Sequence, residues 1–328
     1  MESRALGRTG LSVSALGFGC GNVGGLMVRG APREREQAVA RAMELGVNYF
    51  DTAPVYGDGQ SETNLGQTLK ALGARVYVGT KFRLEPGELR DAPRAIERSL
   101  DASLARLGME SVDLFQLHNA IRPAQGGPTA RDVLDVVVPA LQRLRHGGKI
   151  RFYGLTALGD TDALHEIVGA GTMHTAQVFL NLLNPTAARP VPAGFPAHDF
   201  RQLLGAMKQH GMGAIVVRVL AAGALSGTTV RHPVAVPAVA PIASGPDYEA
   251  DVKRTAAFEA LVKDGHAGSV IEASLRLPLT SDAVSTILLG YSSLEHLEGA
   301  AAAINRGPLP AAALGRLDAI WKELAQPR

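Results

Sequence analysis

Short apolar runs alternate with longer amphipathic stretches along this chain. Within residues 93–107, Ile96, Leu100, Leu104 and Leu107 recur at helical spacing, so their side chains would form one face of a helix. The short apolar runs between such stretches are typical of buried strands. We therefore predict strands over 16–20, 47–50, 76–81, 112–117, 150–155, 175–180, 214–220 and 284–289, and helices over 33–45, 62–72, 93–107, 133–144, 161–168, 199–209, 269–277 and 294–304.

The order of these elements predicts the fold class. Strands that alternate with helices run parallel, and each helix crosses back over the sheet. Eight such units in 328 residues favour an α/β fold of the (β/α)8 TIM barrel type, as one domain over residues 1–328, rather than an open sheet or two domains. Residues 6–11 indicate an N-terminal β-hairpin that closes the barrel bottom, and residues 311–324 an extra C-terminal helix. No G-x-G-x-x-G lies between the first strand and helix, which argues against a doubly wound dinucleotide fold.

Two proline-rich segments, residues 184–196 and 232–246, interrupt this alternation. Each follows a predicted strand, so in a barrel each lies on the face where the carboxyl ends of the strands meet. They are either surface loops without a function or the walls of substrate and cofactor clefts. The pattern leaves both interpretations open.

Charge and cysteine content exclude several classes of protein. The formal net charge is +2 with no block of like charges, which argues against a nucleic-acid partner. The single cysteine, Cys20, allows no internal disulfide and no thiolate metal site, as is typical of a reducing compartment. No apolar run reaches the roughly 18 residues that a membrane span needs, and the N-terminus lacks an apolar signal core. We therefore expect a cytoplasmic protein without a membrane or nucleic-acid partner.

Four polar residues stand at or just after the ends of successive predicted strands: Asp51, Tyr56, Lys81 and His118. Because the carboxyl ends of barrel strands converge on one face, we expect these side chains to share a pocket. Asp51 would pair with the buried ammonium of Lys81, which would in turn favour the phenolate form of Tyr56. His118 would donate a hydrogen bond to a bound oxygen. Such a pocket suits the interconversion of carbonyls and alcohols.

Each of the four residues also has a simpler explanation. Asp51 could cap a turn, Tyr56 could be a loop aromatic, and Lys81 could extend to solvent. His118 could be a hydrogen-bonded histidine of the core. Only their joint position on one barrel face favours the catalytic interpretation. No His, Asp and Glu cluster follows the strands in a metal-binding pattern, so we predict no metal and no metal-assisted hydrolysis.

Longer motifs around these residues carry a family resemblance. The run Gly46–Gly57 (GVNYFDTAPVYG), followed by Ser61-Glu62 and Leu65-Gly66, closely resembles the first signature of the aldo-keto reductases. Three further segments resemble that family's lysine strand, its histidine strand and the segment before its nicotinamide site: residues 78–81 (VGTK), 112–118 (VDLFQLH) and 148–154 (GKIRFYG). The resemblance extends from about Leu6 to Ala300.

The resemblance implies a (β/α)8 barrel that binds NADP(H) or NAD(H) without a Rossmann domain. It implies that hydride passes between the nicotinamide and the carbonyl carbon of a small carbonyl or alcohol substrate. Tyr56 would act as general acid or base, Lys81 would favour its phenolate, and Asp51 would hold Lys81. His118 would orient and polarise the carbonyl.

The cofactor positions that the resemblance implies are less regular. Gln177 matches the residue that binds the carboxamide, and Thr156 stands where the family usually has Ser. Ala157 replaces a common Asn, and the aromatic residue usual on the seventh strand is absent, its place taken by Val217 or Arg218. We expect cofactor contacts from Gly19, Thr156, Gln177, Arg218, Gly290, Ser292, Ser293 and His296.

The adenosine end leaves the choice between NADP(H) and NAD(H) open. Residues 290–296 (GYSSLEH) offer hydroxyls and a histidine, whereas family members that favour NADPH usually present basic residues there. Ala300 stands where Asn commonly contacts adenine. Ser292 and Ser293 could also simply cap the following helix. Our hypothesis is that Arg218 contacts the cofactor or an acidic substrate group; the alternative is an ion pair with a carboxylate of the chain.

The sequence is therefore consistent with two functions. The first is an NAD(P)(H)-dependent oxidoreductase that interconverts aldehydes, ketones or sugars with alcohols. The second is a barrel that binds NAD(P)H as a redox-sensing regulatory module with little turnover. The four filled catalytic positions favour the enzyme. The pattern does not predict the substrate or the oligomeric state.

Overall fold

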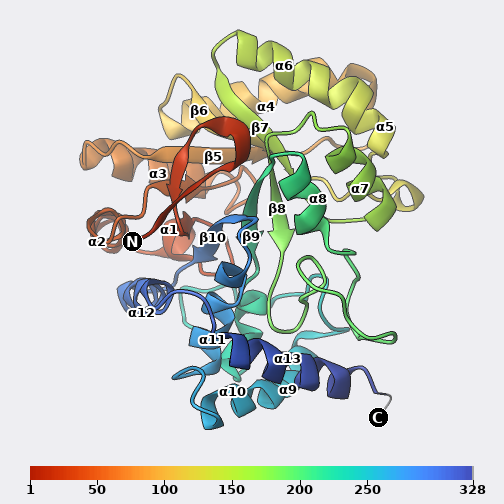
Figure 1. Ribbon diagram of the computed structural model, residues 1–328. Helices are drawn as coiled ribbons and strands as arrows, with labels where there is room; N and C mark the ends of the chain where they lie inside the picture. Colours follow the sequence, from red (N-terminus) through yellow and green to blue (C-terminus); the bar gives the residue numbers. More distant parts are fainter. Residues whose placement is uncertain (327–328) are drawn as a thin grey trace.

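Eight parallel strands close into a barrel in the computed structural model, which describes residues 1–326 (Figure 1). The strands neighbour one another in the order β10-β3-β4-β5-β6-β7-β8-β9, so the predicted (β/α)8 barrel is confirmed. Their bounds are β3 (Leu16–Gly19), β4 (Tyr49–Asp51), β5 (Tyr77–Phe82), β6 (Val112–Leu117), β7 (Ile150–Thr156), β8 (Thr175–Phe179), β9 (Gly213–Val217) and β10 (Val284–Gly290).

Helices follow each strand and pack their apolar faces on the barrel. The apolar face predicted in residues 93–107 is buried as expected in α4. The helices are α1 (Leu26–Arg29), α2 (Pro32–Glu44), α3 (Gln60–Ala71), α4 (Ala92–Leu107), α5 (Ala130–Asp132), α6 (Val138–His146), α7 (Thr161–Gly169), α8 (Leu203–Gln209), α9 (Tyr248–Thr255), α10 (Glu259–Lys263), α11 (Val270–Arg276), α12 (Leu294–Asn305) and α13 (Ala311–Leu324). Within residues 1–326, no helix is both long and apolar enough to cross a membrane.

The N-terminal hairpin closes the bottom of the barrel, as predicted. Strands β1 (Ser3–Ala5) and β2 (Ser12–Ser14) pair antiparallel, and residues 6–11 form the turn between them. The backbone N–H of Arg8 donates to the carbonyl of Gly211, just before β9, over 2.7 Å. The turn packs so closely that a Cβ on Gly7 would lie 2.2 Å from the backbone nitrogen of Gly213, which makes glycine necessary there.

Three predicted elements differ by more than two residues at one end from those observed. The strand expected over 214–220 ends at Val217, because Arg218 adopts a left-handed backbone with φ of 57°. The helix expected over 199–209 begins only at Leu203, because Arg201 and Gln202 are also left-handed. The helix expected over 133–144 begins with a π-helical turn, just before Pro139, which has no N–H to donate.

A second hydrophobic core lies beyond the carboxyl ends of the strands. Residues after β8 and β9 pack there against α9, α10, α11 and α13, which lie together at the lower end of Figure 1, toward which the β8 arrow points. The indole N–H of the buried Trp321 in α13 donates to the carbonyl of Leu182 over 2.8 Å. Helices α9 and α10 were not predicted, although Asp247 is an N-cap whose side chain accepts from the N–H of Ala250. This layer covers part of the face that carries the predicted site.

Candidate active site

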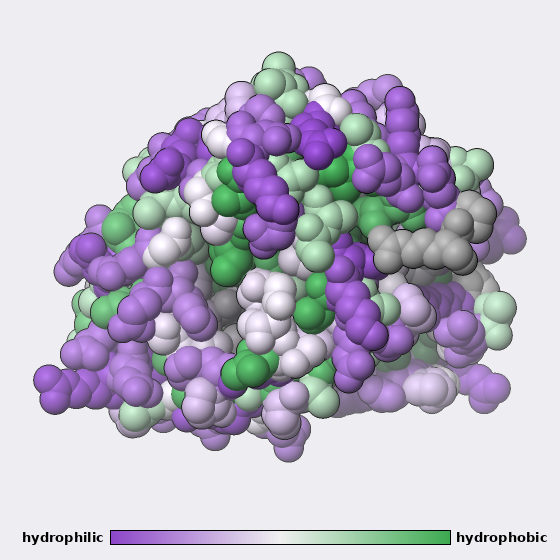
Figure 2. Space-filling model, turned by 90° about the horizontal axis from the view of Figure 1, so that it is seen from below, coloured by the Kyte–Doolittle hydropathy of each residue, from purple (hydrophilic) through white to green (hydrophobic). Residues whose placement is uncertain are grey.

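A cavity of about 1380 Å³ opens at the carboxyl ends of the strands. Its lining includes residues from the ends of β3, β4, β7, β8, β9 and β10 and from the first turns of α12. Figure 2 shows this end of the molecule, with hydrophobic side chains gathered near the middle inside a hydrophilic rim. The cavity exceeds the roughly 300–1,000 Å³ of an ordinary small-molecule site, which leaves room for two ligands side by side.

The predicted carboxylate, ammonium and phenol meet at one side of this cavity. Lys81 is fully buried, and its Nζ donates to Asp51 and, over 2.8 Å, to the carbonyl of Thr52. The same Nζ lies 5.0 Å from the centroid of the Tyr56 ring. Asp51 and Tyr56 line the cavity. The interpretations of Asp51 as a turn cap and Lys81 as a solvated side chain are therefore wrong.

The electrostatics of Lys81 favour its charged form. Burial alone would lower the pKa of the ammonium, but the charges and hydrogen bonds of Asp51 and Tyr56 outweigh burial and raise it. A cation thus stays beside the Tyr56 phenol at every physiological pH.

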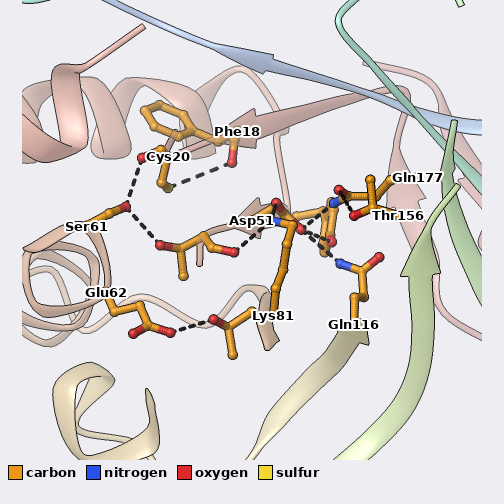
Figure 3. A network of polar contacts seen from close by, with 12 residues as sticks. Phe18, Cys20, Asp51, Ser61, Glu62, Lys81, Gln116, Thr156 and Gln177 are labelled. Carbon is orange, nitrogen blue, oxygen red and sulfur yellow. Dashed lines mark hydrogen bonds and ion pairs between the residues drawn. The ribbon is translucent and has the colours of Figure 1, made fainter. Parts of the chain in front are cut away.

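Asp51 is held in place by more donors than the sequence suggested. Its Oδ2 accepts from the Tyr49 hydroxyl (2.8 Å), Gln116 Nε2 (3.1 Å) and Gln177 Nε2 (2.9 Å), while Oδ1 faces Lys81 (Figure 3). Tyr49 and Gln116 were not predicted. Each stands two residues before a predicted site residue, Asp51 and His118, and the alternation of side chains along a strand is the signal that would have found them.

Gly79 makes room for this network. A Cβ at that position would lie 2.6 Å from the Tyr49 hydroxyl oxygen and 3.2 Å from Oδ2 of Asp51. Any side chain there would displace the hydroxyl from the carboxylate.

The Ser-Glu pair of the family motif has a supporting role. The hydroxyl of Ser61 in α3 donates to the carbonyl of Cys20 over 2.8 Å and hydrogen-bonds Thr52 (Figure 3). The buried carboxylate of Glu62 accepts from Thr80, the residue before Lys81, over 2.5 Å. This pair therefore ties the first turn of α3 to the three strands that carry the site.

His118 follows β6, and its ring stands edge-on to that of Tyr56, with centroids 6.1 Å apart. Its Nδ1 is buried and has no hydrogen-bond partner among the described residues. Burial, and then the charges of Lys81 and Arg83, lower the pKa of the imidazole to about 2. His118 is therefore a neutral side chain of the cavity wall and not a hydrogen-bonded core histidine.

Most of the predicted cofactor positions line the same cavity: Gly19, Thr156, Gln177, Arg218, Gly290, Ser292 and His296. Thr156 Oγ1 donates to Gln177 Oε1 over 3.4 Å, and Gly19 pairs with Gly290 across neighbouring strands. The hydroxyl of Ser292 donates a hydrogen bond to the carbonyl of Gly24 over 2.7 Å.

Ser293 is the exception, because it lies outside the cavity. It is the N-cap of α12, where its hydroxyl accepts from the N–H of His296. For Ser293 the structure thus bears out the helix-cap alternative.

Of the two proline-rich segments, one forms a wall of the cavity and the other does not. Residues 228–243, here called the strap, include seven lining residues and cover most of the segment 232–246. The Arg29 guanidinium in α1 donates to the strap carbonyl of Val234 over 2.7 Å. No residue of 184–196 lines the cavity. That segment instead contributes Val191 and Phe195 to the second core, so its interpretation as a cleft wall is wrong.

Comparison with known proteins identifies the family of this chain. The sequence profile of the aldo/keto reductase family matches residues 15–322. The chain is 31% identical over 310 residues to the L-galactose dehydrogenase of Arabidopsis thaliana, covering 93% of this chain and 88% of the relative. It is 30% identical over 238 residues to a putative voltage-gated potassium channel subunit beta of Schizosaccharomyces pombe, covering 68% and 63%.

Solved structures share the fold. The glycerol dehydrogenase of Gluconobacter oxydans superposes with a TM-score of 0.74 at 24% identity, covering 99% of this chain and 97% of that one. The profile match across almost the whole barrel decides the family. This chain belongs to the aldo/keto reductase family and is an oxidoreductase of carbonyls and alcohols that uses NADP(H) or NAD(H).

Proposed function

We propose that this enzyme interconverts aldehydes, ketones or sugars with alcohols, with Tyr56 as the general acid and base. The observation that carries the proposal is the position of the Lys81 ammonium, which contacts Asp51 and lies 5.0 Å from the centre of the Tyr56 ring. A buried cation beside a phenol attracts the negative charge that develops on the phenol oxygen during proton transfer, so Lys81 would assist the transfer of a proton from Tyr56 to the substrate.

Each of the other residues has a role that follows from its contacts. Asp51, with four donors around it, keeps Lys81 charged and aimed at Tyr56. His118 is neutral, so one ring nitrogen carries a proton that it donates to the carbonyl oxygen of the substrate. In reduction Tyr56 gives its proton to that oxygen, and in oxidation it takes the proton back.

The cavity suits a dinucleotide. Its lining includes Tyr56 on one side and Glu295 and His296 in the first turn of α12, and it encloses about 1380 Å³. His118, whose buried Nδ1 has no hydrogen-bond partner among the described residues, also lines it. When bound, the nicotinamide supplies or accepts the hydride. We propose that Thr156 and Gln177 bind the carboxamide of the nicotinamide. The rest of the dinucleotide would lie against Gly19, Gly290, Ser292 and His296.

We further propose that NAD(H) binds at least as tightly as NADP(H). The α12 end of the cavity presents Glu295 and His296 and, among the described lining residues, no Lys or Arg on that helix. Burial lowers the pKa of His296, so this imidazole carries no charge at neutral pH. A ribose phosphate would meet a carboxylate there without a compensating cation.

Absorbance at 340 nm tests the activity directly. Turnover of NADH or NADPH with a panel of aldehydes, ketones and sugars, or reduction of NAD⁺ with sugars and polyols, is the expected result. Side-by-side fluorescence titration with NADH and NADPH tests the preference. Tenfold tighter binding of NADPH would contradict it.

A regulatory module is the second candidate. Its support is the similarity to a protein named as a putative potassium channel subunit beta. Tight cofactor binding without turnover of any substrate in the panel would favour this candidate over the enzyme.

A further inference from the structure

Arg218 is held at the end of β9 in a conformation that few non-glycine residues adopt. Its φ is 57°, and its carbonyl accepts from Nδ2 of the buried Asn181 over 2.9 Å. Asn181 in turn fixes the tight turn 181–184, where its Oδ1 accepts two backbone N–H groups. Left-handed conformations of this kind cost energy and tend to occur at functional sites.

The guanidinium of Arg218 has almost no partner. Among the described residues its side chain makes one long hydrogen bond, from Nη1 to the carbonyl of Ala240 at 3.4 Å, and no carboxylate lies within 4.0 Å. The ion pair considered from the sequence is therefore not formed. A guanidinium offers five N–H donors, so most of those of Arg218 remain unused.

Arg231, on the same side of the cavity, shows the contrast. Its guanidinium donates to the carbonyls of Val236 (2.6 Å), Ala222 (2.9 Å) and Val23 (3.3 Å) and to the hydroxyl of Tyr248 (3.1 Å). The guanidinium of Arg231 therefore holds the surrounding backbone in place, whereas that of Arg218 makes almost no contact of this kind.

The surroundings of Arg218 also favour the binding of an anion. It lines the cavity, where burial lowers its pKa, the Tyr56 side chain raises it and the Arg231 charge lowers it again. A partly buried cation without a counter-ion is costly, and a guanidinium matches the planar oxygens of phosphate and carboxylate. The counter-ion that the chain does not supply is then supplied by a ligand.

We propose that Arg218 binds an oxyanion of the ligand in this cavity, through paired hydrogen bonds from its guanidinium. The proposal rests on the proposed function only in taking the cavity as the active site. Two ligands carry such a group: the pyrophosphate of the dinucleotide, and a carboxylate or phosphate on an acidic carbonyl substrate. Arg218 lines the cavity, and its Nη1 contacts Ala240 of the strap, so its guanidinium borders the open volume that either ligand would occupy.

The test compares Arg218→Met and Arg218→Lys with the wild type. Arg131→Gln is the matched control, because Arg131 is exposed on α5 and its loss changes the net charge equally. Fluorescence titration gives Kd for NADH, NADPH and inorganic pyrophosphate. Steady-state assays give KM for glyceraldehyde, which is neutral, and for glyoxylate and glyceraldehyde 3-phosphate, which are anionic. Thermal melting checks that each variant folds.

We expect Arg218→Met to raise by about 30-fold or more either the Kd values for the dinucleotides and pyrophosphate or the KM values for the anionic aldehydes. A loss of this size is typical when one partner of a buried charge pair is removed. Weaker binding of both dinucleotides and of pyrophosphate assigns the cofactor. A raised KM for the anionic aldehydes alone assigns the substrate. Arg218→Lys should recover only part of the loss.

A folded Arg218→Met protein whose Kd values and KM values all stay within about twofold of wild type would overturn the proposal. The titrations do not need turnover. A wild-type chain that binds through Arg218 but reduces no substrate would therefore refute the proposed function and leave this inference standing.

Discussion

The two sides of the cavity are built on different principles. The tetrad side consists of Asp51, Tyr56, Lys81 and His118. There the buried ammonium of Lys81 pairs with the carboxylate of Asp51, and this carboxylate accepts three further hydrogen bonds. On the strap side, the guanidinium groups of Arg29 and Arg231 donate hydrogen bonds to backbone carbonyls, whereas that of Arg218 makes one long hydrogen bond.

We interpret this difference as a separation of the proposed proton transfer from the recognition of the ligand. Side chains from strands of a closed barrel cannot shift independently, which suits a proton transfer that depends on distances of a few tenths of an ångström. A loop held by guanidinium contacts to its backbone keeps its shape while its side chains remain free to vary. We therefore expect substitutions on the tetrad side to reduce kcat and those on the strap side to change binding.

The largest effect is expected from Tyr56→Phe. The variant removes the proposed proton donor and leaves the cavity otherwise intact, so kcat should fall by about 10²- to 10⁴-fold while Kd for the cofactor stays the same. Steady-state kinetics and fluorescence titration measure both. Tyr77→Phe, at the opposite end of β5, is the control and should keep full activity. Near wild-type kcat in Tyr56→Phe would refute the mechanism.

Lys81→Met should lose both activity and stability. It leaves the Asp51 carboxylate buried without its cation, which costs about 3–5 kcal/mol in the free energy of unfolding. The double variant Asp51→Asn/Lys81→Met should recover part of this stability but no activity. Urea unfolding checks the order of the three proteins. A single variant as stable as the wild type would show that the pair is not the centre of the network.

Arg231→Met should loosen the strap and leave the tetrad side unchanged. Four hydrogen bonds from a charged group are lost, so unfolding should become easier by about 1.5–3 kcal/mol and limited proteolysis should cut within residues 228–243. Arg189→Met, which removes the ion pair between segment 184–196 and Asp318 of α13, is the control and should not expose the strap. A strap equally resistant in both variants would argue against this role of Arg231.

The smallest effect concerns the pH dependence of stability. The folded protein holds the pKa of His118 at about 2, below the roughly 6.5 of an unfolded chain, so only the unfolded state takes up this proton as the pH falls below 6.5. His118 should therefore reduce the free energy of unfolding by up to about 1.4 kcal/mol per pH unit between pH 6 and pH 4. Urea unfolding across this range should show a shallower slope for His118→Gln and an unchanged slope for the exposed His146→Gln.

Much of this arrangement can be predicted from the amino-acid sequence alone. Period and alternation identify the eight strands, because a buried strand must be apolar and a helix packed on it must carry an apolar face. Asp51, Lys81 and His118 could be placed on one face because parallel strands of a barrel end together. Boundaries set by a single left-handed residue, such as Arg218 at the end of β9, could not be predicted, since only contacts with Asn181 hold that backbone.

Contacts between distant segments came from the folded chain alone. That Tyr49, Gln116 and Gln177 all donate to one carboxylate depends on the stagger of three strands far apart in sequence. The guanidinium of Arg231 makes four hydrogen bonds and that of Arg218 makes one, a difference that depends on where the strap passes. Two arginines thirteen residues apart look equivalent in a sequence. Local residue preferences determine the elements, whereas the pairing of charges is a property of three-dimensional distance.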